Sequence, residues 1–359
     1  MKSIEKNWAK ELAKGIITAE QLLQKKFIAI NEVEKIELAK ENFDIRVPNV
    51  FLDAIDKNIS EIKKQFVPSA QELNFLPEEL EDPIGDERWT PVSGITHRYP
   101  DRVLLKLTYM CASYCRFCFR RYKVSDSAFN LTTEQYHEAI EYIKNNKDIW
   151  EVILTGGDPL TLTDQKLKNV LEDLDKISHV KIVRFHTRIP SVLPARINDS
   201  LIKILKSIQK QIVFVIHINS HHEFNVEAIY AIKRLRAEGF SLLMQSVLLK
   251  DINDDQEKLI KLLKIATENG IKPYYLHYLD LAKGTEHFRV PLRKAINLYN
   301  SLRGLISGIC IPEFILDIPG GKGKISLQSS SVKELENNCW QFISPIDGSK
   351  IVIQYPAEV

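Results

Sequence analysis

Three cysteines lie close together in the segment Thr108-Tyr-Met-Cys-Ala-Ser-Tyr-Cys-Arg-Phe-Cys-Phe-Arg-Arg121. Cys111, Cys115 and Cys118 have C-x3-C-x2-C spacing and follow the apolar run 103–107, which is typical of a strand that ends in a loop. Three thiolates on one loop can bind a soft metal centre, and they are one short of the four that hold a cubane iron–sulfur cluster. An iron without a protein ligand can bind a small molecule, and this spacing suggests S-adenosylmethionine, through its amino and carboxylate groups.

Two other interpretations of the cysteines remain open. A zinc site needs a fourth ligand, which a histidine can supply, and buried thiols can be purely structural. A disulfide is disfavoured because three cysteines cannot pair among themselves and intracellular thiols are kept reduced. Cys310 and Cys339 stand apart from the three and are interpreted as core or incidental thiols.

The cysteine segment resembles that of the radical S-adenosylmethionine (SAM) enzymes. Together with the run His97-Arg-Tyr-Pro-Asp-Arg102, the stretch Cys-Arg-Phe-Cys-Phe-Arg-Arg that ends at Arg121 resembles the lysine 2,3-aminomutase family, and the similarity extends from about Asp82 to about Leu327. The resemblance implies an isomerase that uses a [4Fe–4S] cluster, SAM and pyridoxal 5'-phosphate. Such an enzyme moves the α-amino group of L-lysine to the β-carbon, after a 5'-deoxyadenosyl radical removes a hydrogen from that carbon.

A glycine pair follows the predicted strand 151–154, in Thr155-Gly-Gly-Asp-Pro159. Glycines let a backbone approach a ligand closely and expose amides that bind an amino acid group, although a tight turn explains the same residues in isolation. After a strand that follows the cysteine segment, the motif resembles the family's cofactor-binding motif. The resemblance therefore assigns Gly156, Gly157 and Asp158 to SAM.

Polar side chains also end the next three predicted strands. His186 and Arg188 follow one strand, and the other two strands end in pairs that include two candidate SAM contacts. Side chains at the carboxyl ends of parallel strands share one edge of a sheet, so we expect them to line one cavity, with a solvated rim as the alternative. The two further pairs are His217 with Asn219 and Gln245 with Ser246. By resemblance, His217 and Gln245 contact SAM.

The segment Asp317-Ile-Pro-Gly-Gly-Lys-Gly-Lys324 resembles the loop in which the aminomutases hold their pyridoxal phosphate lysine. The resemblance assigns this role to Lys324, whose amine must lose a proton and condense with an aldehyde. Lys322 occupies a position that is usually glycine, and such a loop is by itself often a solvated turn. Arg98 and Arg102 are the expected donors to the cofactor's phosphate, with surface ion pairs as the alternative.

Three charged residues are the predicted substrate contacts. Arg120 matches the family's contact to the substrate α-carboxylate, for which a planar bidentate donor is suited, and Arg121 is interpreted as structural. Asp280 and Asp317 match two carboxylates that bind a distant ammonium group. Because two buried acids without a cation would be costly, a lysine side chain explains the pair, although a helix cap or a surface acid explains either one alone.

The elements that position these residues alternate along the chain. Short apolar runs predict strands at 103–107, 151–154, 181–185, 212–217, 242–248 and 273–277. Amphipathic segments predict helices at 133–146, 164–177, 198–210, 226–238, 254–269 and 291–306. Six βα units imply parallel strands with right-handed crossovers, as in an α/β sheet, and the resemblance makes this a partial (β/α)6 barrel. We expect a helical N-terminal region at 1–90, the barrel core at 91–307 and a C-terminal segment with the lysine loop at 308–359.

The composition of the 359 residues is that of an ordinary globular protein. With 49 basic and 47 acidic residues, the formal charge is +2, and no basic block calls for nucleic acid or a membrane surface. The first residues lack the apolar core of a signal peptide, and no run approaches the ~18 apolar residues of a membrane span. We therefore expect a cytoplasmic protein. The resemblance implies an electron donor for the cluster as a partner, and a homo-oligomer remains open.

Two features bear on the substrate. Phe117 stands where some free-lysine enzymes have histidine, and the compact length resembles the branch that modifies a lysine on elongation factor P. Asp317 and the Pro-Gly-Gly loop look altered in that branch, so their presence here favours free lysine. A third hypothesis is a non-catalytic metal-binding protein that keeps the barrel without the reaction.

Overall fold

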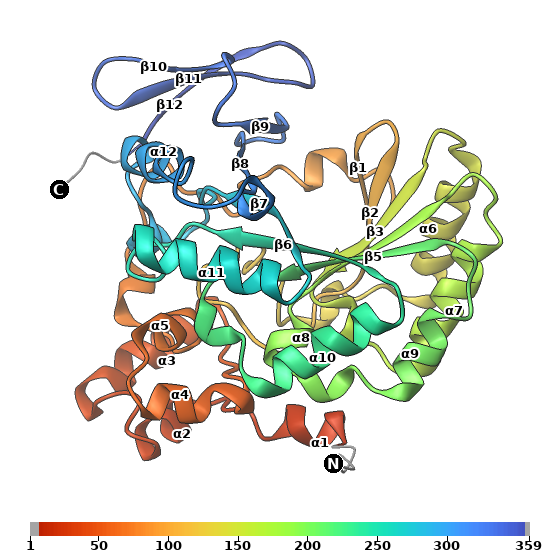
Figure 1. Cartoon of the computed structure of the whole chain (residues 1–359), viewed down its shortest axis with the longest axis horizontal. Coiled ribbons are helices and arrows are strands. Elements are labelled where there is room, and N and C mark those ends of the chain that lie inside the picture. The colour runs from red at the N-terminus through yellow and green to blue at the C-terminus, as the bar shows by residue number, and fades with distance from the viewer. Residues whose placement is uncertain (1–6, 356–359) are drawn as a thin grey trace.

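A computed structural model describes residues 7–355 and contains a nine-stranded sheet whose strands follow one another in chain order from β1 to β9 (Figure 1). Strands β2 to β8 are parallel, and the antiparallel β1 and β9 form the two edges. The sheet curls into a half-barrel. Its strands are β1 (Ile95–Tyr99), β2 (Arg102–Thr108), β3 (Glu151–Gly156), β4 (Ile182–Thr187), β5 (Gln211–His217), β6 (Ser241–Val247), β7 (Lys272–His277), β8 (Glu313–Asp317) and β9 (Lys324–Ser326).

Helices connect the parallel strands and cover the sheet. α7 shows how the sequence specifies them, because the side chain of Thr163 caps its first turn and its apolar residues recur on one buried face. The predicted helices are all present, with ends that differ by up to five residues. The helices after β2 are α6 (Thr133–Asn145), α7 (Asp164–Asp175), α8 (Ile189–Val192), α9 (Asp199–Leu205), α10 (Val226–Ala237), α11 (Gln256–Glu268) and α12 (Leu292–Ser301).

The six predicted strands are confirmed as β2 to β7, and the partial barrel is confirmed with them. Two more strands of the same sheet were not predicted. β8 pairs with β7 in parallel, and β9 returns antiparallel to β8 after the glycine-rich loop. The sheet therefore continues across the boundary predicted at 307–308. β9 has only three residues, so it carries no periodic signal of its own.

The N-terminal region is helical, as predicted. Thr18 opens α2 with a capping box, in which its side chain accepts a hydrogen bond from the amide of Gln21. Its helices are α1 (Trp8–Ala13), α2 (Ala19–Gln24), α3 (Val33–Asn42), α4 (Leu52–Asp56) and α5 (Ser60–Phe66). Figure 1 shows these helices in red and orange, on the opposite side of the view from the last strands of the chain.

Those last strands form a separate antiparallel sheet of β10 (Val332–Glu334), β11 (Cys339–Ile343) and β12 (Lys350–Gln354). Its buried face includes Trp340 and Phe342, which belong to the same hydrophobic core as the main sheet. Among the described residues, no helix combines the length and apolar character needed to span a lipid bilayer.

Candidate active site

A cavity of about 660 Å³ opens within the half-barrel and brings the predicted site residues together. It extends from the cysteine loop to β9, so residues more than two hundred positions apart face one space. Every residue that the sequence analysis assigned to the cluster, to a cofactor or to the substrate lines it. These are Arg98, Arg102, Cys111, Cys115, Cys118, Arg120, Gly156, Gly157, Asp158, His217, Gln245, Asp280, Asp317 and Lys324.

The three thiols lie on the loop that follows β2. Burial, followed by the charge of neighbouring groups, raises the pKa of Cys111 well above its ordinary value, and burial raises the pKa of Cys118 to about 11. Both thiols therefore keep their protons until a cation stabilises the thiolates. Within residues 7–355, no group of three His, Cys, Asp or Glu side chains surrounds the position of a single metal ion.

The N-terminal region holds the cysteine loop in place. Glu72, in the short helical turn η3 (Ala70–Leu73), binds Arg116 through both oxygens at 2.9 and 2.7 Å and Arg121 at 2.6 Å. Arg116 also donates to the backbone carbonyls of Phe43 and Asp44. All three charged side chains are buried, and the two arginines outweigh burial and lower the pKa of Glu72. The expected structural role of Arg121 is confirmed by these contacts, whereas the sequence analysis missed Glu72.

The glycine pair packs against the cysteine loop. A side chain at Gly157 would overlap the backbone at Tyr109 and Met110, and Gly156 has a positive φ of 106°. The amides of Gly157 and Asp158 donate to the carbonyls of Thr108 and Met110, at 2.6 and 2.9 Å. These two amides are therefore occupied within the protein, contrary to the expectation that the motif exposes them. Contact between this motif and SAM through other atoms stays a prediction.

The Asp158 carboxylate joins the end of β3 to the end of β4. It accepts hydrogen bonds from the hydroxyl of Thr187 at 2.9 Å and from the amide of Arg188 at 2.7 Å. Burial nevertheless raises the pKa of Asp158 to about 6. Its carboxylate thus has a positioning role in the structure, and the motif as a whole fixes the cysteine loop to the sheet.

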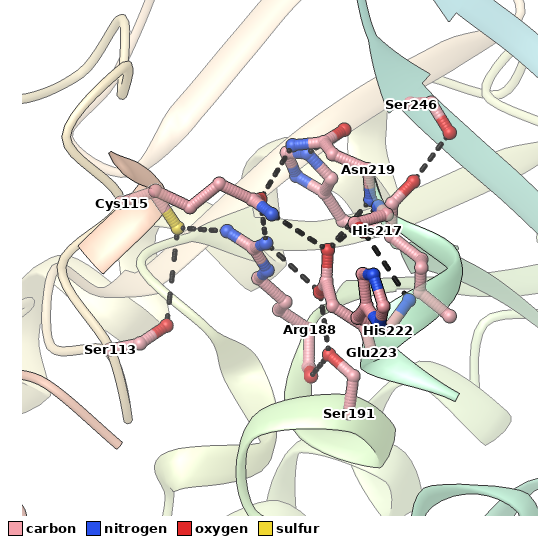
Figure 2. A network of polar contacts seen from close by, with 12 residues as sticks. Ser113, Cys115, Arg188, Ser191, His217, Asn219, His222, Glu223 and Ser246 are labelled. Atoms are coloured by element: carbon pink, nitrogen blue, oxygen red, sulfur yellow. Dashed lines mark hydrogen bonds and ion pairs between the residues drawn. The ribbon is translucent and has the colours of Figure 1, made fainter. Parts of the chain in front are cut away.

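A buried polar network lies beside the cysteine loop (Figure 2). His217 contacts Asn219 at 3.2 Å and lies in register with Gln245 on the neighbouring strand. Burial and the charge of Arg188 lower the pKa of His217, so its imidazole is neutral. Asn219 and Ser246 were expected to line the cavity, but their side chains bond to backbone groups and to Gln65. Asn219 lies just beyond β5, and Ser246 lies inside β6, where successive side chains point to opposite faces of the sheet, so it faces away from the side of Gln245.

Asp317 is the centre of a second cluster, at the end of β8. Its carboxylate accepts a hydrogen bond from the ammonium of Lys324 and lies 3.4 Å from a guanidinium nitrogen of Arg98. His277 lies 3.9 Å away. Burial alone would raise the pKa of Asp317, but Lys324 and these neighbours lower it, so the carboxylate is charged. The antiparallel pairing of β8 with β9 places Asp317 opposite Lys324.

Asp86 connects two of the predicted arginines and was missed by the sequence analysis. Its Oδ2 atom accepts from Nε and pairs with Nη2 of Arg120, at 2.9 and 2.8 Å, and its Oδ1 lies 3.6 Å from Arg98. The positive charge around it, led by Arg120, overcomes burial and lowers the pKa of Asp86. The only signal in the sequence was its place at the end of the turn Asp82-Pro-Ile-Gly-Asp86.

Asp280 follows β7 and brings a second carboxyl group to the cavity. Burial, followed by the charge of Asp317, raises its pKa to about 8. Among the described residues no hydrogen bond or ion pair is made to this carboxyl group. Arg102, in contrast to Asp280, has charged and aromatic partners. Its guanidinium pairs with Asp101 at 2.7 Å and stacks over the ring of Tyr99, and these contacts hold it at the edge of the cavity.

Comparisons with known proteins identify the family. A family model described as the radical SAM superfamily matches residues 105–263. An L-lysine 2,3-aminomutase of Methanococcus maripaludis is 40% identical, over 85% of this chain and 71% of the relative. Enzymes of the same name from Clostridium subterminale and Buchnera aphidicola are each 37% identical, over 91% and 90% of this chain and 79% and 97% of the relatives. The chain therefore belongs to the lysine 2,3-aminomutase family of the radical SAM superfamily, a family of isomerases.

Proposed function

We propose that this protein is a pyridoxal phosphate-dependent radical SAM aminomutase that converts free L-lysine to β-lysine. The observation that carries the proposal is the pair of buried carboxyl groups, Asp280 and Asp317, in the cavity that also contains the three thiols. Asp317 already pairs with Lys324 and Arg98, whereas the carboxyl group of Asp280 is buried beside it without a paired cation in the part of the chain that the structure describes. An ammonium group on a long aliphatic chain would supply that charge.

The thiols fit the [4Fe–4S] cluster and SAM that membership of the superfamily implies. Cys111, Cys115 and Cys118 would hold three of the four irons, and thiolates bound to separate irons need not surround one point in space. The reduced cluster would supply one electron to SAM. The protein would fix the cysteine loop through the ion pairs of Glu72. It would also exclude water from the cluster, since Phe117 packs against His217 and Phe288 beside the third cysteine.

The opposite end of the cavity fits pyridoxal phosphate. Lys324 faces the cavity, whereas the ammonium of Lys322 turns outward to Asp347 at 2.7 Å. This difference supports Lys324 as the residue that binds the aldehyde, despite the lysine that replaces a glycine at 322. Arg98 and Arg102 would hold the phosphate. The cofactor would supply a conjugated ring able to delocalise an unpaired electron.

The remaining residues orient the substrate. Arg120 would bind the α-carboxylate, and its guanidinium is already held by Asp86 on one side and Thr155 on the other. Asp280 and Asp317 would bind the ε-ammonium. Two fixed ends determine which carbon of the chain faces the thiol end of the cavity, and this positioning is the main contribution that the residues make to the reaction.

The test is an anaerobic comparison of substrates. The purified protein is reconstituted with iron, sulfide, SAM, pyridoxal phosphate and a reductant, then incubated with free L-lysine or with elongation factor P. Mass spectrometry should detect β-lysine from the free amino acid. Product found only on elongation factor P would reject free lysine in favour of the protein-bound residue, and a protein that binds zinc without an aldehyde cofactor would favour the non-catalytic alternative.

A further inference from the structure

A buried arginine contacts one of the three thiols. Arg188 directly follows β4, and its Nη1 atom lies 2.8 Å from the sulfur of Cys115 (Figure 2). The other terminal nitrogen, Nη2, donates to Gln65 at 2.5 Å and to Glu223 at 3.0 Å. Among the described residues, Cys115 is the only thiol of the three that accepts a hydrogen bond from a charged side chain.

The guanidinium of Arg188 is fixed by the hydrogen bonds of its two terminal nitrogens and by two aromatic rings, whereas its Nε atom has no hydrogen-bond partner among the described residues. The guanidinium stacks over the ring of Phe66 at 4.6 Å and lies 5.5 Å from the ring of Phe117. Its carboxylate partner is fixed as well, because Glu223 accepts hydrogen bonds from the amides of Asn219 and Ser220 through its other oxygen. The arginine therefore cannot turn its Nη1 atom away from the sulfur without breaking this packing.

An ion pair with Glu223 alone would explain a buried arginine, but it does not explain the orientation of Nη1. Hydrogen bonds to cysteine sulfurs and nearby positive charge are among the factors that set the reduction potential of an iron–sulfur cluster. Reduction adds one negative charge, which is shared by the sulfurs. A donor fixed beside one of them stabilises the reduced state more than the oxidised state, and so raises the potential.

We propose that Arg188 is a positioning residue that orients Cys115 and raises the reduction potential of the cluster. This inference rests on the proposed function only in that the three thiolates hold a [4Fe–4S] cluster. The arginine makes the cluster easier for a cellular electron donor to reduce. Gln65 gives the N-terminal region a share in this role, because α5 brings it to Arg188 and to Glu223.

The experiment measures the midpoint potential of the reconstituted cluster without SAM or lysine, by redox titration followed with electron paramagnetic resonance. Arg188→Lys keeps the positive charge but loses the planar fork, and we expect a lower potential. The double variant Arg188→Met with Glu223→Gln removes both buried charges together, so that neither is left unpaired. We expect the ratio of reduced to oxidised cluster to fall about tenfold at a fixed potential, which equals a shift of ~59 mV for one electron.

Arg196→Met is the matched control. Arg196 is also buried and binds the carbonyl of Leu160 and the carboxylate of Asp164, with no sulfur contact. We expect its midpoint potential to equal that of the wild type. An unchanged potential in both Arg188 variants at full iron content would overturn the proposal, and so would an equal shift of the potential in Arg196→Met. Because no substrate is present, loss of lysine turnover leaves the result unaffected.

Discussion

Replacing Asp280 with asparagine should stabilise the ligand-free protein while it removes most of the lysine turnover. The carboxyl group is buried, and its pKa is raised to about 8 by burial and by Asp317. An unfolded aspartate has a pKa of about 3.9. Between these values the folded state holds a proton that the unfolded state has released, so the free energy of unfolding decreases as the pH rises.

The size of the effect follows from this interval. Near pH 7 the protonation of Asp280 in the folded state lowers the free energy of unfolding by at most about 4 kcal/mol, at ~1.36 kcal/mol per pKa unit. Part of the repulsion between the two carboxyl groups is offset at Asp317, where the effect of Lys324 exceeds that of burial and lowers the pKa. We therefore expect Asp280→Asn to gain about 2 kcal/mol near neutral pH, because asparagine is neutral at every pH. The gain should be absent near pH 4 and reach its full value above about pH 8.

Urea unfolding of the ligand-free protein at several pH values measures this gain. Asp347→Asn is the control, because Asp347 pairs with Lys322 on the surface and should show no gain at any pH. In the reconstituted enzyme, loss of one carboxylate from the substrate's ammonium should lower kcat/KM for lysine about 100-fold, equal to about 3 kcal/mol. If Asp280→Asn proves less stable than the wild type near pH 7, the carboxyl group is compensated in the folded protein and the reasoning fails.

Three further substitutions test other parts of the site. Glu72→Gln leaves Arg116 and Arg121 buried without a carboxylate and should lower the free energy of unfolding by about 3 to 5 kcal/mol in denaturant titrations. Lys324→Ala should abolish borohydride-trapped pyridoxal phosphate, detected by mass spectrometry, whereas Lys322→Ala should retain it. Arg120→Lys loses the planar fork and should raise KM for lysine about 10- to 100-fold in steady-state assays, and an unchanged KM would exclude carboxylate binding by Arg120.

The sequence predicted the parallel strands well for a physical reason. A strand buried on both faces of a sheet reads as a continuous apolar run, as in 151–154 and 212–217. Polar residues at the ends of such runs must lie at one edge of the sheet. This rule predicted that His217 and Gln245 line the cavity, as they do. The cysteine segment was equally accessible, because its chemistry depends on spacing within one loop.

The supporting residues could not be predicted in the same way. Glu72 and Gln65 lie on helices of the N-terminal region, yet their side chains bind Arg116 and Arg188 in the core. Such contacts depend on how the region packs against the barrel, and a lone polar residue has no period that reveals its partner. Asp86 was hidden for the same reason, inside a turn whose composition signals only a change of direction.

The ion pair between Lys324 and Asp317 links cofactor binding to substrate binding. In the ligand-free protein, the ammonium of Lys324 binds the carboxylate of Asp317, which the substrate's ammonium would need. Lys324 must lose its proton and leave Asp317 before it can react with an aldehyde, so capture of pyridoxal phosphate also frees Asp317 for lysine. Asp317→Asn removes the ion pair, and we expect faster capture of pyridoxal phosphate, followed by absorbance, together with weaker lysine binding.

Asp86→Asn is the matched control for this prediction. It disturbs Arg98 as Asp317→Asn does, but Asp86 makes no contact with Lys324 within the described residues. Its rate of pyridoxal phosphate capture should therefore stay close to that of the wild type, or fall if Arg98 binds the phosphate less well. Equal capture rates in the wild type and in Asp317→Asn would mean that the ion pair does not limit the reaction of Lys324. Binding of the cofactor and of the substrate would then be independent.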